Sequence, residues 1–132
     1  MHVDVFGFDV ELDTSLVDDA DPEVRRQVEE YVAGERTTFD LSVAFPATFT
    51  GEVLRLLVEI PAGETRGYAE LADELDSVPR AVGGGCARNP LPVVVPCHRV
   101  VGVDSLVGYR YPGLKSRLLD HEGATYPGEP LA

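Results

Sequence analysis

The sequence predicts an α+β fold, in which a short N-terminal α/β segment (residues 1–45) precedes a mainly helical domain (residues 46–132). Three observations lead to this expectation. Apolar residues alternate near the start, as in strands, whereas further along they recur at helical spacing. Two of the expected helices are short and separated by a tight turn, which suggests a helix-turn-helix. The length, 132 residues with 44% apolar composition, suits one modest core.

The N-terminal segment is predicted to hold a strand region and one helix. The strand signal comes from apolar residues close to alternation: Val3, Val5, Phe8 and Val10. Asp21 precedes a proline and a glutamate, so a helix is expected over residues 22–33, with Asp21 as its cap and Gly34 as its stop. The inward residues of that helix are Val24, Val28, Tyr31 and Val32. Residues 39–45 predict an extended linker.

Three further helices are expected before residue 90. The first starts at Thr48 and ends by Pro61, and its apolar stripe comprises Val53, Leu54, Leu57 and Val58. The second starts near Gly67 and stops at about Asp76, and it turns four residues inward: Tyr68, Leu71, Ala72 and Leu75. The third covers residues 79–87. The second and third form the helix-turn-helix pair.

The last part of the chain predicts a buried extended segment and a final helix. Three prolines bracket residues 93–95, an apolar triplet that is expected to be extended and buried. The final helix is marked by Leu114, Leu118 and Leu119 and ends before Gly123.

The net charge of −12 argues at first against nucleic acid, because basic side chains supply most of the non-specific affinity for DNA. The charge is unevenly distributed, however: residues 1–40 carry a balance of −9 and residues 41–132 only −3. The stretch 77–103 has no acidic residue and contains Arg80, Arg88 and Arg99. That stretch is therefore predicted to face a polyanion.

Other features of the composition restrict cell compartment and cofactor class. Abundant acidic residues with a single lysine, Lys115, are typical of haloarchaeal proteins. There is no run of 18 apolar residues, and Asp4 and Asp9 lie near the start, so neither a membrane span nor a signal peptide is predicted and the protein is expected to be cytoplasmic. Cys86 and Cys97 fit neither a redox pair nor a zinc site. No metal or other cofactor is expected.

The most informative run is Pro96-Cys97-His98-Arg99-Val100. A cysteine acts as a nucleophile through its thiolate, and a nearby base or positive environment must favour that state. The alternative is that Cys97 is simply a small buried apolar residue. A histidine base needs a third group to hold its tautomer, and Glu122 near the end of the last predicted helix is the available carboxylate.

Six motifs occur in order between residues 48 and 123. They are Gly67-Tyr68-Ala69-Glu70-Leu71-Ala72, Arg80-Ala81-Val82-Gly83-Gly84, Arg88-Asn89-Pro90, Pro96-Cys97-His98-Arg99-Val100-Val101, Gly108-Tyr109-Arg110 and Leu118-Leu119-Asp120-His121-Glu122-Gly123. In this order and spacing they resemble the catalytic domain of the O6-alkylguanine-DNA alkyltransferases. The resemblance implies a winged helix-turn-helix-like catalytic domain. It also implies a monomer that binds double-stranded DNA containing O6-alkylguanine, flips the base out and moves the alkyl group irreversibly to Cys97.

The resemblance assigns the helix at 79–87 to the minor groove, with Arg80 filling the gap that the flipped nucleotide leaves. The DNA-contacting residues would be Arg80, Ala81, Gly83, Gly84, Cys86 and Arg88. Glycines in a helix interior cost about 1 kcal/mol each relative to alanine, and close approach of DNA to the backbone would explain the run that starts at Gly83. Cys86 is expected to pack or to contact the groove, not to accept an alkyl group.

The catalytic residues implied by the resemblance are Cys97, His98, Glu122, Tyr68 and Asn89. Tyr68 would donate to the guanine ring as it leaves, and Asn89 would tie the recognition helix to the active-site loop. His98 would act on the thiol through a water. The substrate pocket would be formed by Val95, Tyr109, Arg110 and Tyr111, with the carbonyls of Val95 and Cys97 recognising the exocyclic amine.

Some features depart from the family pattern. The turn before Pro79 is about two residues short, and the N-terminal segment offers only His2 as a metal ligand, so zinc is not expected there.

Two other functions compete with alkyl transfer. One is a non-enzymatic lesion-binding protein that recruits other repair factors, which the retention of Cys97 disfavours. The other is a thiol hydrolase using Cys97 and His98, which would need an oxyanion hole.

Overall fold

In the computed structural model, which describes residues 1–102 and 109–127, the chain begins with a hairpin of β1 (His2–Val5) and β2 (Phe8–Glu11). The turn residues Phe6 and Gly7 both have positive φ, 51° and 87°. A two-residue hairpin turn needs this conformation, because it matches the twist of the flanking strands. The predicted strand region is confirmed, and its core-facing residues are Val3, Val5 and Val10.

After the 3-10 helix η1 (Thr14–Leu16), α1 (Asp21–Val32) follows within one residue of its predicted bounds. The predicted cap is wrong. Ala20 is the N-cap, and Asp21 is already the first helical residue. The Asp21 carboxylate instead accepts a hydrogen bond of 2.9 Å from the Thr14 hydroxyl, so it joins α1 to η1 rather than capping the helix.

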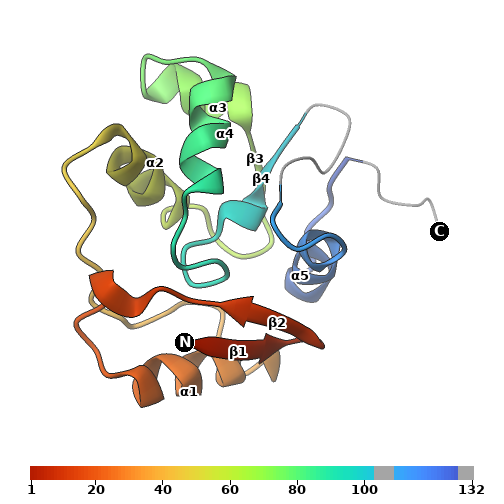
Figure 1. Ribbon diagram of the computed structural model, residues 1–132. Helices are drawn as coiled ribbons and strands as arrows, with labels where there is room; N and C mark the ends of the chain where they lie inside the picture. The colour runs from red at the N-terminus through yellow and green to blue at the C-terminus, as the bar shows by residue number, and fades with distance from the viewer. Residues whose placement is uncertain (103–108, 128–132) are drawn as a thin grey trace.

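The next helices form one group (Figure 1). They are α2 (Phe49–Leu57), α3 (Tyr68–Glu74) and α4 (Pro79–Ala87), all close to their predicted positions. Thr48 caps α2 with its hydroxyl. Val58, predicted on the inner stripe, is 46% exposed, because the helix has already ended at Leu57.

Helix α4 packs tightly on α2 at Gly85. A Cβ atom there would lie 2.9 Å from Cγ2 of Val53. Gly85 is therefore required by helix packing, whereas the sequence analysis attributed the glycine run to close approach of DNA.

The loop after α4 differs from the expected extended segment. Val93 and Val94 form a turn, in which the Leu91 carbonyl accepts a hydrogen bond of 2.8 Å from the Val95 amide. Val93 has φ of 77°, a conformation that is costly for a β-branched residue. The prediction of burial is confirmed, since Val93, Val94 and Val95 are at most 7% exposed.

The chain then forms the 3-10 helix η2 (Cys97–Arg99) and β4 (Val100–Val101). β4 pairs in parallel with β3 (Arg66–Gly67), the short strand before α3. The last helix, α5 (Leu114–Glu122), ends at Gly123 as predicted. Gly123 has φ of 73°, the left-handed conformation common after a helix end.

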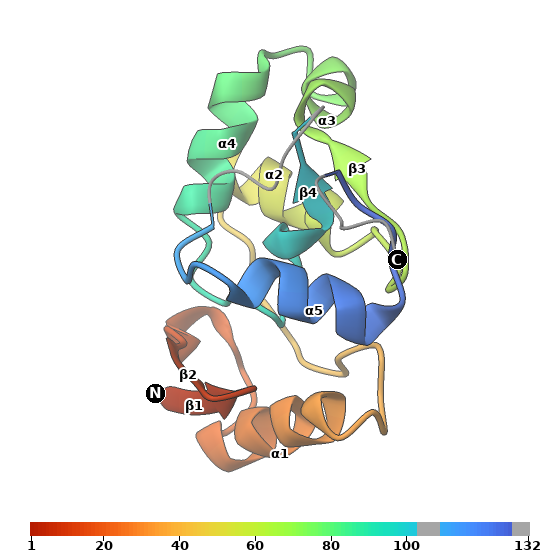
Figure 2. The same ribbon diagram turned by 90° about the vertical axis from the view of Figure 1, so that its right-hand side faces the viewer.

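A continuous buried cluster contains residues from α1 and the hairpin as well as from α2, α4 and α5. Figure 2 shows α5 lying between the N-terminal segment and the group of α2, α3 and α4. The fold is therefore a mixed α/β arrangement in which α5 contacts both parts. In the part of the chain described, no helix has the length and apolar character needed to cross a membrane.

Candidate active site

Cys97 lies at the start of η2 and opens into a cavity of about 330 Å³ beside the end of α4. The lining residues are Cys86, Ala87, Asn89, Pro92, Cys97, Tyr109 and Arg110. Small-ligand sites span about 300–1,000 Å³, so the cavity suits a single aromatic base.

Cys97 is 7% exposed. Burial raises the pKa of Cys97, while a hydrogen bond from Asn89 and the positive charges of Lys115 and Arg110 act in the opposite direction. Burial has the larger effect. The resting protein therefore holds a neutral thiol, and a base must remove its proton before it reacts.

His98, which directly follows Cys97 in η2, forms a buried pair with Glu122. Nε2 of His98 lies 2.7 Å from Oε2 of Glu122, and the side chains are 0% and 1% exposed. Burial lowers the pKa of His98, outweighing the opposing effect of Glu122. Burial also acts to raise the pKa of Glu122, but the hydrogen bonds from His98 and Arg99 hold it well below its usual range. The pair is thus a neutral imidazole and a carboxylate.

The hydrogen-bond network assigns the tautomer of His98. A carboxylate only accepts, so Nε2 carries the proton and Nδ1 is left with a lone pair. Nδ1 is buried and has no hydrogen-bond partner among the described residues. A neutral imidazole held in this way can accept a proton at Nδ1.

Arg99 was predicted to face a polyanion, and this is wrong. It is 5% exposed, its Nε lies 2.9 Å from Oε1 of Glu122, and its Nη1 donates to the Ile60 carbonyl at 2.6 Å. The sequence around Arg99 contains no acidic residue, and its carboxylate partner lies on α5, 23 residues later. Arg99 neutralises Glu122 and does not reach the surface.

Asn89 joins the end of α4 to the active-site loop. Its Nδ2 donates to the Val95 carbonyl at 2.8 Å, and its Oδ1 accepts from the Leu91 amide at 3.0 Å. The Val95 carbonyl also accepts from the Cys97 amide at 2.8 Å. Both of its lone pairs are therefore in use, which argues against the predicted role of this carbonyl in recognising a base amine.

Tyr68 begins α3 and is half-buried near both thiols. Burial, followed by the repulsion that Cys86 and Cys97 exert when they are ionised, raises the pKa of Tyr68 to about 12, so the phenol remains a donor at neutral pH. Nζ of Lys115 lies 5.8 Å from the centre of its ring.

Lys115 is a site residue that the sequence reasoning missed. It is 3% exposed, and its Nζ donates to the Val100 carbonyl at 2.6 Å. Its charge favours the Cys97 thiolate. Lys115 is the only lysine in the sequence, and that composition alone does not distinguish a buried site residue from a haloarchaeal trait.

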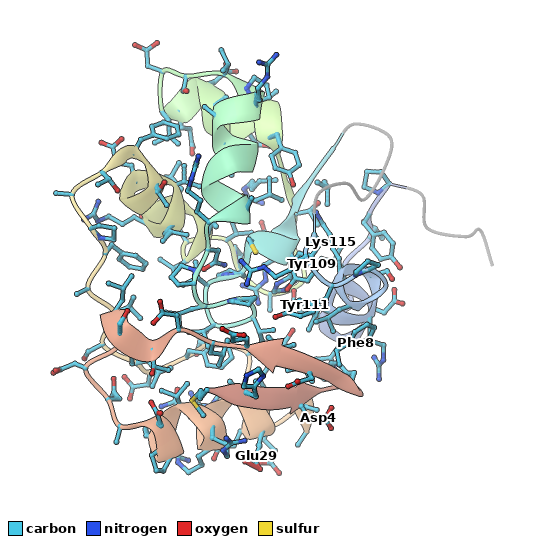
Figure 3. All side chains as sticks on the ribbon, in the orientation of Figure 1. Asp4, Phe8, Glu29, Tyr109, Tyr111 and Lys115 are labelled. Atoms are coloured by element: carbon cyan, nitrogen blue, oxygen red, sulfur yellow. The ribbon has the colours of Figure 1, made fainter. Side chains whose placement is uncertain are left out.

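Of the four predicted pocket residues, Tyr109 and Arg110 line the cavity, whereas Val95 and Tyr111 do not. The Tyr109 hydroxyl is buried without a partner among the described residues. The Tyr111 ring lies 6.3 Å from that of Tyr109 (Figure 3), but its hydroxyl accepts from the Glu11 amide of β2 at 3.0 Å. Tyr111 is thus held by the N-terminal segment. Gly108 lies outside the described residues.

The outer face of α4 carries the residues expected to contact DNA. Arg80 and Arg88 are exposed, and Ala81, Gly83 and Gly84 are half-buried. A Cβ at Gly83 would come no closer than 4.0 Å to another group, and one at Gly84 would meet only the flexible end of Arg88. Packing therefore does not require glycine at either position.

Cys86 and two acidic residues of the N-terminal segment, Asp4 and Glu29, lie away from this face. Cys86 is 7% exposed and lines the cavity with Cys97, so it packs inside. Asp4 and Glu29 lie at the end of the molecule opposite α3 and α4 (Figure 3).

A larger cavity of about 530 Å³ is bordered by the linker and by Arg99 and Glu122, but not by Cys97. Within residues 1–102 and 109–127, no three His, Cys, Asp or Glu side chains gather as a metal site would require.

Comparison with known proteins gives one consistent result. The family model described as "6-O-methylguanine DNA methyltransferase, DNA binding domain" matches residues 48–124. The methylated-DNA–protein-cysteine methyltransferase of Archaeoglobus fulgidus is 43% identical over 112 residues, covering 79% of this chain and 76% of the relative. The constitutive enzyme of that name from Bacillus subtilis is 44% identical over 110 residues, covering 79% and 67%.

Solved structures agree. The crystal structure of Mycobacterium tuberculosis O6-methylguanine methyltransferase superposes with a TM-score of 0.70 and 38% identity, covering 83% of this chain and 70% of that one. The structure of Mycobacterium tuberculosis OGT in complex with DNA gives 0.68 and 38%, covering 81% and 70%.

Proposed function

The chain belongs to the methylated-DNA–protein-cysteine methyltransferase family, and we propose that it repairs DNA by moving an alkyl group from O6 of guanine onto Cys97. The observation that carries this proposal is the buried His98–Glu122 pair, whose histidine directly follows Cys97 in η2 and whose Nδ1 is unpartnered among the described residues. That arrangement supplies the base that a buried thiol needs. No cofactor enters the reaction.

The chemical step balances within these residues. Nδ1 of His98 takes the thiol proton through a water, and Glu122 stabilises the imidazolium that forms. Sγ of Cys97 attacks the alkyl carbon, the bond from that carbon to O6 breaks, and the electron pair remains on guanine. Tyr68, kept protonated by burial, donates to the guanine ring as negative charge develops. Lys115 favours the thiolate during the attack.

The transfer is proposed to be irreversible, with one protein repairing one lesion as a monomer. A thioether has no good leaving group at neutral pH, because a thiolate would have to depart from a saturated carbon, so water does not cleave the new bond. The alkylated chain is therefore the end product.

For DNA recognition we propose that α3 and α4 act as a winged helix-turn-helix-like unit within a domain of residues 46–132. Arg80 and Arg88 are exposed on α4, and Gly83 and Gly84 leave its backbone open. Arg80 would fill the gap left by the flipped guanine, since a planar guanidinium can stack on bases. The acidic N-terminal segment lies at the other end of the molecule, which limits its repulsion of the phosphates.

The variant Arg80→Ala tests this assignment. It should strongly slow repair of O6-methylguanine in a duplex, because unstacking a base costs a few kcal/mol that nothing then offsets. Reaction of Cys97 with free O6-benzylguanine needs no flipping and should stay near wild type. The measured quantity is the ratio of duplex to free-base rates.

Tyr68→Phe serves as the comparison, because it weakens leaving-group stabilisation and should slow both substrates alike. An unchanged ratio in Arg80→Ala would show that α4 does not enter the DNA as proposed. The shortened turn before Pro79 would then be the first feature to re-examine.

A further inference from the structure

Helix α1 brings Tyr31 from the N-terminal segment to the end of α5. The Tyr31 hydroxyl donates a hydrogen bond of 2.5 Å to Oε2 of Glu122, across 91 residues of sequence. Tyr31 is 1% exposed, so this contact is protected from water. The proposed chemical step does not involve this hydrogen bond.

We propose that Tyr31 is a positioning residue for alkyl transfer: it fixes the Glu122 carboxylate and thereby sets the proton affinity of His98. This inference rests on the proposed function. It gives the N-terminal segment a role in the chemistry, because Glu122, His98 and Cys97 all lie after residue 46.

The argument depends on which oxygen Tyr31 contacts. Oε2 of Glu122 accepts from Nε2 of His98 at 2.7 Å, and Nη2 of Arg99 donates to the same atom at 2.9 Å. The phenol therefore shares the oxygen that orients the imidazole. Tyr31, Arg99 and His98 together account for the donors that the structure gives to this oxygen.

Tyr31 is itself held on both sides. The rings of Phe39 and His121 lie 5.7 Å and 5.1 Å from its ring, and Nε2 of His121 lies 2.7 Å from the Tyr31 carbonyl. Burial, and then the charge of Glu122, raise the pKa of Tyr31 well above its usual range. The hydroxyl thus stays protonated, and a donor, at neutral pH.

The sign of the effect on His98 follows from charge sharing. The charged groups that act on the imidazole are Glu122, Arg99 and Lys115. Tyr31 withdraws part of the negative charge of Glu122 through its hydrogen bond. Without this bond the carboxylate stabilises an imidazolium more strongly, so the pKa of His98 rises. A base with a higher pKa is protonated, and thus inactive, over more of the acid range.

The experiment uses the full chain with Tyr31→Phe, which keeps the ring and removes only the hydroxyl. The matched control is Tyr126→Phe, since the Tyr126 hydroxyl donates at 2.7 Å to Asp120, a different carboxylate on α5. The pKa of His98 is read by NMR from its ring nitrogens, and the rate of Cys97 alkylation by free O6-benzylguanine is measured against pH.

In Tyr31→Phe, both the His98 titration and the acid limb of the rate profile should move to higher pH by roughly 0.5 to 1 unit. Tyr126→Phe should leave both in place. In a Glu122→Gln background, Tyr31→Phe should produce no further shift, because the proposed coupling runs through the carboxylate.

An unmoved His98 titration overturns the proposal. A rate lowered equally at all pH values, without a shift, also overturns it, because a purely structural role predicts that result. If the titration shifts while the wild-type chain does not alkylate at all, the coupling stands and the proposed function fails.

Discussion

Replacing Arg99 by leucine should lower the free energy of unfolding by about 3–5 kcal/mol, the range found when one partner of a buried ion pair is removed. Arg99 is 5% exposed and contacts both oxygens of Glu122 at 2.9 Å, and it also donates to the Ile60 carbonyl at 2.6 Å. Leucine fills much of the volume, so the loss comes mainly from the unpaired carboxylate, not from a cavity.

The assay is urea denaturation in molar potassium chloride, with Arg88→Leu as the control. Arg88 is exposed at the end of α4, and surface substitutions usually stay within about 0.5 kcal/mol. Adding Glu122→Gln to Arg99→Leu should restore most of the lost stability, because no charge is then buried alone. A loss below about 1 kcal/mol in Arg99→Leu would refute the role given to this pair.

Three further predictions concern packing, pH and salt. Gly85→Ala should destabilise the fold by about 1–3 kcal/mol through its contact with Val53, whereas Gly83→Ala should leave the melting temperature of the wild-type chain unchanged or raise it, but weaken DNA binding. Equal melting temperatures for the two variants would contradict this. The unfolding free energy should fall as pH drops below about 6.5, and further below about 4.5, because folding lowers the proton affinity of His98 and then of Glu122. Urea titrations across that range check it, and a pH-independent value would argue against it. Repair should persist in molar potassium chloride, because the Debye length is then about 3 Å and the acidic N-terminal segment no longer repels the phosphates of DNA. Activity confined to salt below roughly 0.1 M would refute the haloarchaeal interpretation.

The helices were predictable because their signals are local. Apolar spacing and flanking residues located α4, the start of α2 and the end of α5 to within about one residue, whereas α2 ends at Leu57, before the predicted stop at Pro61. Local patterns failed where a distant contact decides the structure. Val93 adopts positive φ because the buried loop closes on Leu91, and no property of the valine triplet signals that turn.

The site residues also differ in how far local sequence could predict them. The pairing of His98 with Glu122 was predictable from a motif and the need for a carboxylate, and the structure contains that contact. Arg99 was misjudged because its charge was counted as surface charge, although its partner lies 23 residues away. Tyr31 was placed correctly in the core by helical spacing, but that spacing cannot show that its hydroxyl ends at Glu122.

Mass spectrometry of the chain after reaction with duplex DNA containing O6-methylguanine tests the central claim most directly. Alkyl transfer predicts a single methyl group, on the peptide containing Cys97, with no more than one lesion repaired per protein. Cys97→Ala should lose this modification and keep DNA binding. Methylation at Cys86, repeated turnover, or repair without any change in protein mass would contradict the account.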